Sequence, residues 1–296
     1  MSDWKLFIPT YNRTQLNCLK LLERDSEIEL NLCVREEQLA DGFYDFLKGA
    51  ERVNLISLGT GIRDLGETRQ RILTHCKEND IDFCVMLDDG LDNIYCKSCE
   101  KLSPSDCISA AVEQMKNDKM SKYCAIYQFH RPERKYSNVD ASSRYFVGMP
   151  LQALIINVKI AKDYDLNYYP ICEAGFEDEA FFIDAVKKGL ITCSNSEINV
   201  SGALPNVPKV GGSHGTSDTK MLVERYDRYN TLFLKHIGPT YGVYITKCMR
   251  HSIGAQVSYC LFDYAYFKKV LVDDRDENQE IIDKHFKIDN PWEETR

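Results

Sequence analysis

Asp82-Phe-Cys-Val-Met-Leu-Asp88-Asp89-Gly90-Leu-Asp92 decides the fold class of this chain, because it is an apolar run that ends in a cluster of carboxylates. The apolar residues are few and continuous, and Asp-Asp-Gly cannot extend them, so they predict a central strand. The acids then lie at its carboxyl end, where open α/β sheets bind ligands. Oxygen ligands there suit Mg²⁺ or Mn²⁺ that bridges substrate phosphates. The alternative is a solvated Asp-rich turn, because the same residues dominate turns.

Strand-like and helix-like segments alternate along the chain. Apolar runs recur over residues 4–8, 28–34, 53–58, 81–87, 123–129 and 153–158, and several of them predict buried strands. Helices are predicted over 14–24, 36–49, 63–79, 104–117 and 175–189. This alternation predicts an α/β fold with a mainly parallel sheet flanked by helices. A loop rich in Gly, Pro and Ser over 201–218 precedes a strongly helical segment at 219–237. We therefore expect one domain over 1–218 and a helical C-terminal region over 219–296 packed on it.

The composition is that of an ordinary globular protein, with 44% hydrophobic and 28% charged residues. No apolar stretch approaches the ~20 residues of a membrane span, and the first residues lack the apolar core of a signal peptide. A cytoplasmic protein without a membrane partner is expected. The net charge of -8 argues against a basic nucleic-acid surface over the whole molecule, though not against a local patch.

The twelve cysteines are scattered through apolar segments without a secretory signal, so reduced core thiols are the favoured interpretation. The exception is Cys96-Lys-Ser-Cys99 followed by Cys107. Its C-x2-C spacing suits Zn²⁺ if a fourth ligand comes from elsewhere.

The first predicted strand ends in Phe7-Ile-Pro9-Thr10-Tyr11-Asn12-Arg13. Proline ends the strand, and Thr10, Asn12 and Arg13 supply hydrogen-bond donors at the edge of the sheet, which is a place to hold a nucleotide. By itself, so short a motif is more often a strand-to-helix turn with Thr or Asn as the helix cap.

Three arginines, Arg63, Arg69 and Arg71, lie on or just before a predicted helix that follows Gly59-Thr-Gly61. The guanidinium fork is suited to phosphates. Because their spacings of two and six residues cannot put all three on one helical face, we predict that Arg69 faces inward at the site and that one of the others is a surface residue.

Two further motifs supply acids and a histidine. Glu177 and Asp178 lie at a predicted helix start, where a carboxylate can act as general base for a hydroxyl acceptor. Acids there also stabilise the helix dipole whether or not they catalyse anything. His214 lies in Gly211-Gly-Ser-His214-Gly, a setting that favours a metal or phosphate ligand over a core histidine.

In their order and spacing, these motifs resemble the nucleotide-sugar glycosyltransferases of the GT-A type, over about residues 4 to 215. Ile8-Pro-Thr-Tyr-Asn-Arg, the arginines before Met-Leu-Asp88-Asp89-Gly, Gly-Phe-Glu-Asp178-Glu and the late His214 carry the resemblance. Gly61-Ile-Arg and Thr-Arg69-Gln-Arg-Ile-Leu ahead of Leu-Asp-Asp further resemble the TET-associated glycosyltransferases of bacteriophages, which are thought to sugar-decorate hydroxymethylated pyrimidines in DNA.

The resemblance implies a Rossmann-like catalytic domain over 1–218 that binds a nucleotide sugar and transfers its hexosyl group to a hydroxyl. The divalent metal, Mn²⁺ or Mg²⁺, is then held by Asp88 and Asp89, with His214 as a further ligand. Asp178 maps to the base of inverting members, with Glu177 beside it. Pro9, Thr10, Tyr11, Asn12, Arg13, Arg63, Arg69 and Asp88 are assigned to donor binding.

One departure from the family pattern concerns Gly90, which stands where the last acid of the metal motif is usual. Either Asp92 substitutes for that acid from the next turn, or metal binding is weaker or absent. A retaining enzyme would not need Asp178 as a base.

Two other functions fit parts of the sequence. Nucleotidyl transfer also uses paired acids and a metal, but Pro-Thr-Tyr-Asn-Arg is a poor version of its phosphate loop. A non-catalytic nucleic-acid-binding module could use zinc at the cysteines. DNA contact, whether by an enzyme or by a binding module, would depend on a local basic and aromatic run that includes Arg131, Arg134 and Lys135. The alternative is that this run is a solvated loop.

Overall fold

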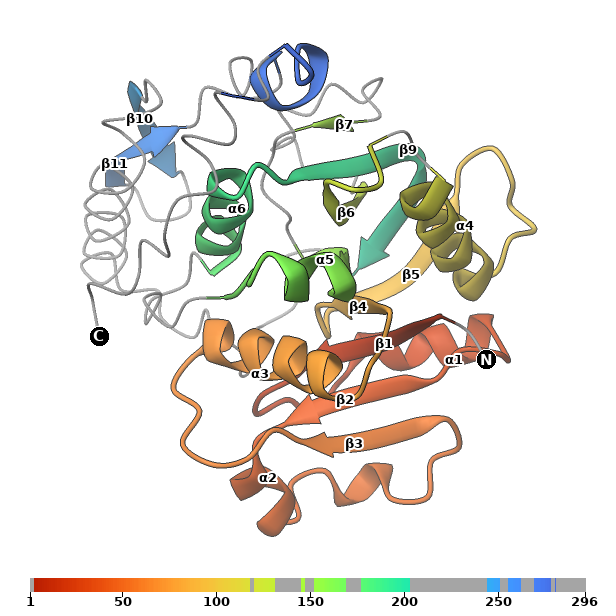
Figure 1. The fold of residues 1–296 in the computed structure, drawn as a ribbon. Coiled ribbons are helices and arrows are strands. Elements are labelled where there is room, and N and C mark those ends of the chain that lie inside the picture. The colour runs from red at the N-terminus through yellow and green to blue at the C-terminus, as the bar shows by residue number, and fades with distance from the viewer. Residues whose placement is uncertain are drawn as a thin grey trace.

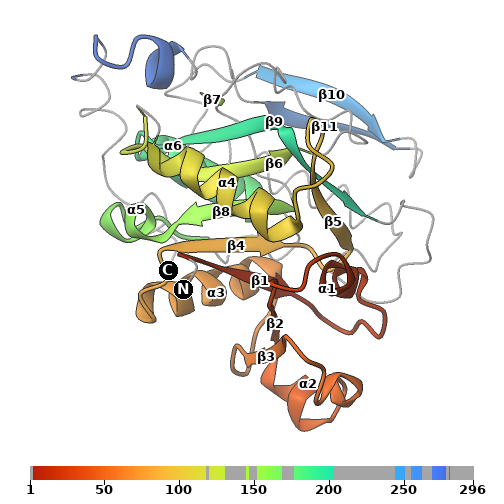
Figure 2. The ribbon, with the colours of Figure 1, turned by 90° about the vertical axis from the view of Figure 1, so that its right-hand side faces the viewer.

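The computed structural model describes residues 3–117, 120–130, 145–146, 152–168, 177–202, 244–250, 255–261, 269–277 and 280. They form one nine-stranded sheet and a separate two-stranded sheet. Two clusters of buried side chains cover the large sheet, one shared with helices α1 and α4 and the other with α3 and α5. The sheet therefore has helices on both faces (Figures 1 and 2).

The large sheet is mixed but most of its strands point the same way. Its order is β3-β2-β1-β4-β8-β6-β9-β5, with β7 beside β9. β1, β2, β3 and β4 are mutually parallel neighbours, and β6 is parallel to β9. β8 runs antiparallel between β4 and β6, and β5 and β7 run antiparallel to β9. The predicted α/β class with a mostly parallel sheet is confirmed.

Each of the six apolar runs contains a strand. They are β1 (Trp4–Pro9), β2 (Leu30–Val34), β3 (Val53–Ser57), β4 (Phe83–Leu87), β6 (Cys124–His130) and β8 (Ala153–Asn157). The sequence analysis missed β5 (Leu91–Cys96), β7 (Tyr145–Phe146) and β9 (Ile191–Gly202). β5 and β9 carry polar residues among their apolar ones, as in LDNIYC, and so lack the continuous apolar run that marks a buried strand.

The helices agree with prediction where they are long. α3 (Leu65–Glu78) and α4 (Pro104–Asn117) are 14 residues each, and α6 spans Glu177–Lys187. α5 (Val158–Asp163) was not predicted. The helices predicted over 14–24 and 36–49 are shorter: α1 is Lys20–Arg24 after a 3₁₀ turn at Asn17–Leu19, and α2 is Glu36–Ala40 before a 3₁₀ turn at Asp45–Leu47. Gly42, with φ +70°, follows α2 in a conformation that ends a helix.

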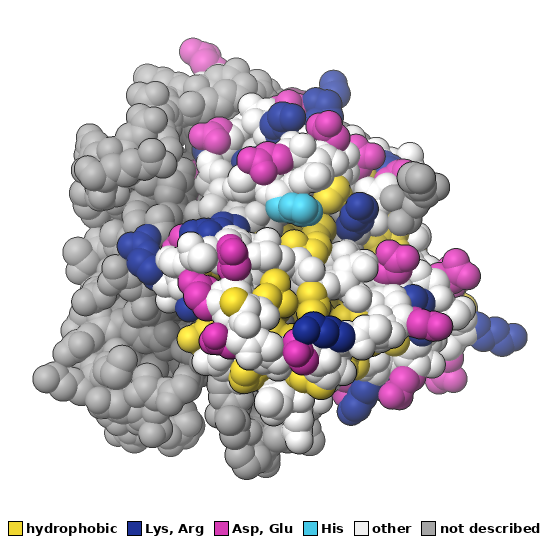
Figure 3. All heavy atoms as spheres, turned by 90° about the horizontal axis from the view of Figure 1, so that it is seen from below, with side chains coloured by type: hydrophobic (Ala, Val, Ile, Leu, Met, Phe, Trp, Pro, Cys, Tyr) yellow, Lys and Arg dark blue, Asp and Glu magenta, His cyan; other side chains and the backbone are white. Residues whose placement is uncertain are grey.

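β3 is the edge strand at the bottom of the sheet in Figure 1. Its apolar side chains are half-buried, and Phe46 nearby is 52% exposed. Figure 3 looks at this side from below and shows hydrophobic side chains gathered between charged ones. This edge strand therefore exposes more apolar surface than edge strands usually do.

Within the described residues, no helix is long and apolar enough to cross a membrane.

The C-terminal region is described in part. β10 (Tyr244–Arg250) and β11 (Ala255–Leu261) pair as an antiparallel hairpin, followed by a short π-helix at Lys269–Asp273. The predicted helix at 219–237 lies outside the described residues, so the helical extension stays a prediction. Leu271 is fully buried in a core cluster, and the Arg275 guanidinium stacks on the Tyr123 ring at 3.4 Å. These contacts pack residues 271–275 against the core cluster that covers the large sheet.

Replacing Leu271 by Ala tests that packing. Because the side chain is fully buried, we expect the free energy of unfolding to fall by about 2–5 kcal/mol, measured by urea unfolding. The control is Lys269→Ala, since Lys269 is exposed. Equal stability of the two variants would show that the segment does not pack on the core.

Candidate active site at the carboxyl edge of the sheet

The candidate site lies at the edge where β1, β2 and β4 end. Because the three strands are parallel neighbours, their carboxyl ends meet, and the residues that follow them lie together. Thr10 follows β1, Arg35 follows β2 and Asp88 follows β4. The Thr10 amide donates to the Cys33 carbonyl at 3.1 Å, which holds the two loops together. The edge therefore combines polar groups from three strands.

Asp89 links the end of β4 to the end of β1. Its Oδ2 accepts the Thr10 hydroxyl at 3.0 Å and lies 2.9 Å from Arg13 Nε. Burial raises the pKa of Asp89 to about 6, against the opposing effects of Arg13 and Thr10, and the neighbouring Asp88 raises it further. A bound cation near Asp89 would offset the cost of burying its charged form.

Arg69 links the end of β4 to the start of α6. Its Nη2 donates to Asp88 Oδ1 at 2.9 Å, and its Nη1 contacts Asp178 Oδ1 and lies 3.5 Å from Glu177 Oε1. The Arg69 side chain is only 4% exposed, while that of Asp88 is 29% exposed. One buried guanidinium therefore holds the strand-end carboxylate of Asp88 and the two acids at the start of α6 in a single cluster.

The charges around Arg69 stabilise its cation. Burial alone lowers the pKa of Arg69, but the Glu177 and Asp88 carboxylates outweigh it and hold the pKa above its ordinary value. Three carboxylates share this one cation, so the cluster keeps a net negative charge. Arg69 Nε and the Tyr168 hydroxyl are both buried without a hydrogen-bond partner among the described residues.

The structure brings together most of the predicted site residues and separates a few. Two groups of contacts meet at the adjacent residues Asp88 and Asp89: Thr10 and Arg13 contact Asp89, and Arg69 joins Asp88 to Glu177 and Asp178. Arg63 was predicted to bind the donor, but its side chain is 60% exposed and pairs with Glu67 through Nε at 3.4 Å. It is the surface arginine that the helical spacing required.

The predicted loop after β1 makes contacts of its own. Pro9 closes β1 opposite Cys33, and the Arg35 guanidinium stacks on the Tyr11 ring at 3.9 Å from the centroid. Asn12, with φ +53°, accepts a hydrogen bond from Gln38 Nε2 at 2.8 Å. The sequence analysis did not select Arg35, although it directly follows a predicted buried strand and the strand-end argument applies to it.

Oxygen ligands for Mg²⁺ or Mn²⁺ are present but incomplete. Asp88 and Asp89 supply carboxylates of the right kind, yet within the described residues no group of three or more His, Cys, Asp or Glu could hold a metal ion. Asp92 does not complete the site: it lies on β5 and pairs with Lys20 at 3.6 Å and with the Ser201 hydroxyl at 3.3 Å. His214, the predicted third ligand, lies outside the described residues.

Gly90 is not required by the packing around it. A Cβ at Gly90 would meet nothing within 4 Å, whereas one at Gly202 would lie 2.6 Å from the Gly90 carbonyl oxygen. The close approach of β9 therefore needs glycine at 202 and not at 90. The third acid of the family pattern is missing for a reason other than space.

The part of the chain that the structure describes includes all three cysteines of the zinc hypothesis and gives it no support. Cys96 and Cys107 are buried in a core cluster with Cys99 packed against it, and they form no metal-binding group. Burial raises the pKa of Cys107 to about 12, so the thiol stays protonated. The basic run with Arg131, Arg134 and Lys135 lies outside the described residues.

Comparison with known proteins places the fold. No protein-family model and no curated protein matches the chain. A mannosyltransferase from Pyrobaculum calidifontis, solved with GDP-Man and Mn²⁺, superposes with a TM-score of 0.50 at 12% identity, over 76% of this chain and 63% of that one. The fold is similar to that of GT-A nucleotide-sugar glycosyltransferases.

Two more solved structures are similar at lower scores. Glucosyl-3-phosphoglycerate synthase from Mycobacterium tuberculosis, solved with Mg²⁺ and UDP, has a TM-score of 0.46 at 10% identity, over 86% of each chain. A 4-diphosphocytidyl-2C-methyl-D-erythritol synthase has a TM-score of 0.38 at 14% identity, over 72% of this chain and 95% of that one. The chain spans less than two thirds of the mannosyltransferase. At these identities the likeness concerns the fold and not the activity, and the bacteriophage subfamily is not shown.

The raised pKa of Asp89 predicts how stability varies with pH. In the folded protein this carboxyl titrates near pH 6 instead of 3.8, so the folded state retains a proton that the unfolded chain releases. The contribution of Asp89 to the free energy of unfolding therefore falls as pH rises from about 4 to 6, by at most about 3 kcal/mol. Asp89→Asn has no carboxyl group to ionise, so it avoids this loss of stability and keeps an oxygen that can accept the Thr10 hydroxyl.

We expect Asp89→Asn to be more stable than the wild type at pH 7.5 in metal-free buffer. The difference should shrink as pH is lowered toward 4.5, as measured by urea unfolding at each pH. A difference that grows on acidification would contradict the assignment.

Removing the buried cation should destabilise the fold. Arg69→Met leaves the carboxylates of Asp88, Glu177 and Asp178 without their shared cation, and we expect a loss of about 3–5 kcal/mol. Arg63→Met, on an exposed arginine just before the same helix, is the control and should stay within about 0.5 kcal/mol of the wild type. Adding Asp178→Asn to Arg69→Met should restore part of the loss. An additive loss in urea unfolding would contradict the charge argument.

Proposed function

We propose that the protein is a metal-dependent glycosyltransferase that moves a sugar from a nucleotide sugar to a hydroxyl group. The observation that carries the proposal is the contact of one buried guanidinium with both Asp88 and Asp178. It brings a strand-end carboxylate, where a GT-A fold binds its nucleotide, next to an acid at a helix start. Sugar transfer needs both: charge neutralisation on the leaving diphosphate and a base on the attacking hydroxyl.

The donor side of the proposed reaction comprises Asp88, Asp89, Thr10 and Arg13. Mn²⁺ or Mg²⁺ held by Asp88 and Asp89, together with His214, would neutralise charge on the leaving diphosphate. Arg13 is partly exposed beside Asp89, so its guanidinium can also pair with a phosphate oxygen. Tyr11 and Asn12 complete the nucleotide side of the site.

The acceptor side comprises Asp178 and Glu177. Asp178 accepts the proton of the attacking hydroxyl, and Glu177, which is more deeply buried, shares the Arg69 cation. Arg69 itself takes a different role from the one predicted from the sequence. With its side chain buried against carboxylates, it orients Asp88 and Asp178 and leaves phosphate binding to Arg13.

The acceptor beyond a hydroxyl group stays a prediction. Hydroxymethylated pyrimidine in bacteriophage DNA is implied only by the sequence resemblance, and the net charge of -8 does not favour a broad DNA surface. The proposed chemistry does not depend on the identity of the acceptor.

A panel of nucleotide sugars with and without Mn²⁺ tests the function. We expect one donor to raise the melting temperature only with metal, and the same donor to be hydrolysed or transferred. Asp178→Asn should reduce turnover by about 10²–10⁴-fold while nucleoside diphosphate binding persists, and Asp88→Asn should abolish the metal-dependent shift. Asp163→Asn, which changes an exposed carboxylate paired with Lys159, is the control.

Two outcomes would refute the proposal. The first is no hydrolysis or transfer from any nucleotide sugar with either metal. The second is full activity in both Asp88→Asn and Asp178→Asn. Release of pyrophosphate from a nucleoside triphosphate, instead of a nucleoside diphosphate from a sugar donor, would indicate nucleotidyl transfer.

A further inference from the structure

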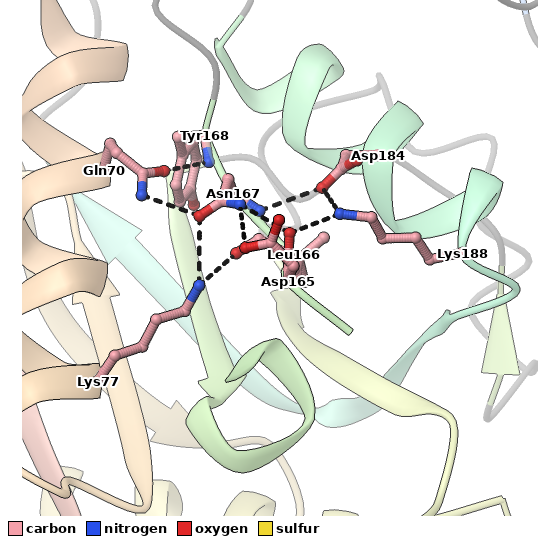
Figure 4. Close-up of polar contacts among 8 residues, drawn as sticks. All are labelled: Gln70, Lys77, Asp165, Leu166, Asn167, Tyr168, Asp184 and Lys188. Atoms are coloured by element: carbon pink, nitrogen blue, oxygen red, sulfur yellow. Dashed lines mark hydrogen bonds and ion pairs between the residues drawn. The ribbon is translucent and has the colours of Figure 1, made fainter. Parts of the chain in front are cut away.

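A polar seam joins α3 to α6 through the segment that follows α5 (Figure 4). We call it the α3–α6 seam. It comprises Gln70 and Lys77 on α3, Asn167 and Tyr168 on the connecting strap 165–168, and Asp184 with its neighbour Lys188 at the end of α6.

Asn167 is the centre of the seam. Its side-chain oxygen accepts from Gln70 Nε2 at 3.1 Å and from Lys77 Nζ at 3.2 Å, both on α3. Its backbone amide donates to Asp184 Oδ2 on α6 at 3.1 Å. Its side-chain amide donates to the Asp165 carbonyl at 2.7 Å, which fixes the strap itself. One residue thus bonds to both helices and to its own loop.

The seam and the candidate site share one face of α6 and use neighbouring residues of α3. Glu177, Phe181, Asp184 and Lys188 are spaced by four, three and four residues, so they lie along one face of α6. Glu177 faces Arg69, and Phe181 stacks on Tyr168 with ring centroids 4.0 Å apart. Gln70, next to Arg69 in sequence, accepts the Tyr168 amide at 2.5 Å. The contacts that fix the strap therefore also fix Arg69 against the start of α6.

The polar groups of the seam lose more hydration energy on burial than apolar contacts between two helices would. Asp184 is fully buried, its Oδ1 has no partner among the described residues, and burial raises its pKa to about 6. Burial also lowers the pKa of the Lys77 amine. Apolar side chains would pack the two helices together without this desolvation cost. Directional hydrogen bonds, in contrast, form in only one register of α6 against α3.

We propose that Asn167 is a positioning residue that sets the register of α6 against α3, and through it the placement of Asp178 relative to Asp88. The inference rests on the proposed transfer function for its kinetic test. It assigns Gln70 and Asn167 to acceptor-side geometry, without contact to the substrate. A misplacement of about 1 Å is enough to slow such a reaction by about 100-fold.

The test is the Asn167→Ala variant of the full chain, together with Gln70→Ala and the double variant. We expect kcat to fall by about 10- to 100-fold in each single variant, with KM for the nucleotide sugar changed by less than about threefold. The double variant should lose little more than either single one, because both changes break one network. The matched control is Asn157→Ala, which removes the asparagine that caps α5 and lowers stability without touching α6.

A crystal structure of Asn167→Ala gives a readout that does not depend on activity. The start of α6 should shift relative to β4, and Arg69 should lose its contact with Asp178. An unshifted α6, or a kcat equal to that of Asn157→Ala, would overturn the inference. If the wild type transfers no sugar, the proposed function fails, and the crystal structure alone decides whether the seam sets the register.

Discussion

The buried cation of Arg69 is the interaction on which the arrangement of this protein depends. A guanidinium that is nearly excluded from water must meet carboxylates, because an unpaired buried charge costs several kcal/mol. Asp88 meets it from the end of β4, and Glu177 and Asp178 meet it from the start of α6. These three elements are distant in sequence and belong to different layers of the fold. They meet at the Arg69 guanidinium on α3, whose buried charge is paired with carboxylates from both β4 and α6.

The same arrangement explains why the edge of the sheet is suited to a cation and an anionic ligand. Parallel strands bring Thr10 and Arg13 beside Asp89, as Arg69 brings Asp178 beside Asp88. The carboxylates outnumber the arginines that pair with them, and burial raises the pKa of Asp89 to about 6. A divalent metal ion would balance this charge, and the metal together with Arg13 would then attract a diphosphate. Under the proposed function, these are the groups at this edge of the sheet that would serve sugar transfer.

Hydrophobic pattern was enough to predict the core of the fold. The continuous apolar runs of β4 and β8, and the capped, periodic segments of α3 and α4, were recognisable because burial on one or both faces leaves a regular trace in the sequence. β5 and β9 escaped because polar residues interrupt their apolar ones. The sequence also left open that Asp92 replaces the acid missing at Gly90. It does not, because the turn after Asp89 is so tight that Asp92 already belongs to β5.

The site was predictable in its members but not in its connections. Helical spacing placed Arg69 inward and left either Arg63 or Arg71 on the surface. In the structure Arg69 is buried, and Arg63, which was assigned to donor binding, is the exposed one. Spacing could not show that Glu177 and Asp178 would close over the same guanidinium, since that contact joins residues 108 or more positions apart and depends on the tertiary fold. For the same reason the sequence did not predict the contacts of Asn167 with α3 and α6. An asparagine in a short loop has no periodic pattern that would indicate such contacts.

The most direct test of this account is a crystal structure with Mn²⁺ and a nucleoside diphosphate, UDP and GDP being tried in turn. The account predicts that the metal and the diphosphate lie at Asp88 and Asp89, that Arg13 contacts a phosphate oxygen, and that Arg69 stays paired with Asp178. A diphosphate bound elsewhere, or an Arg69 side chain that leaves the carboxylates to bind phosphate, would contradict it.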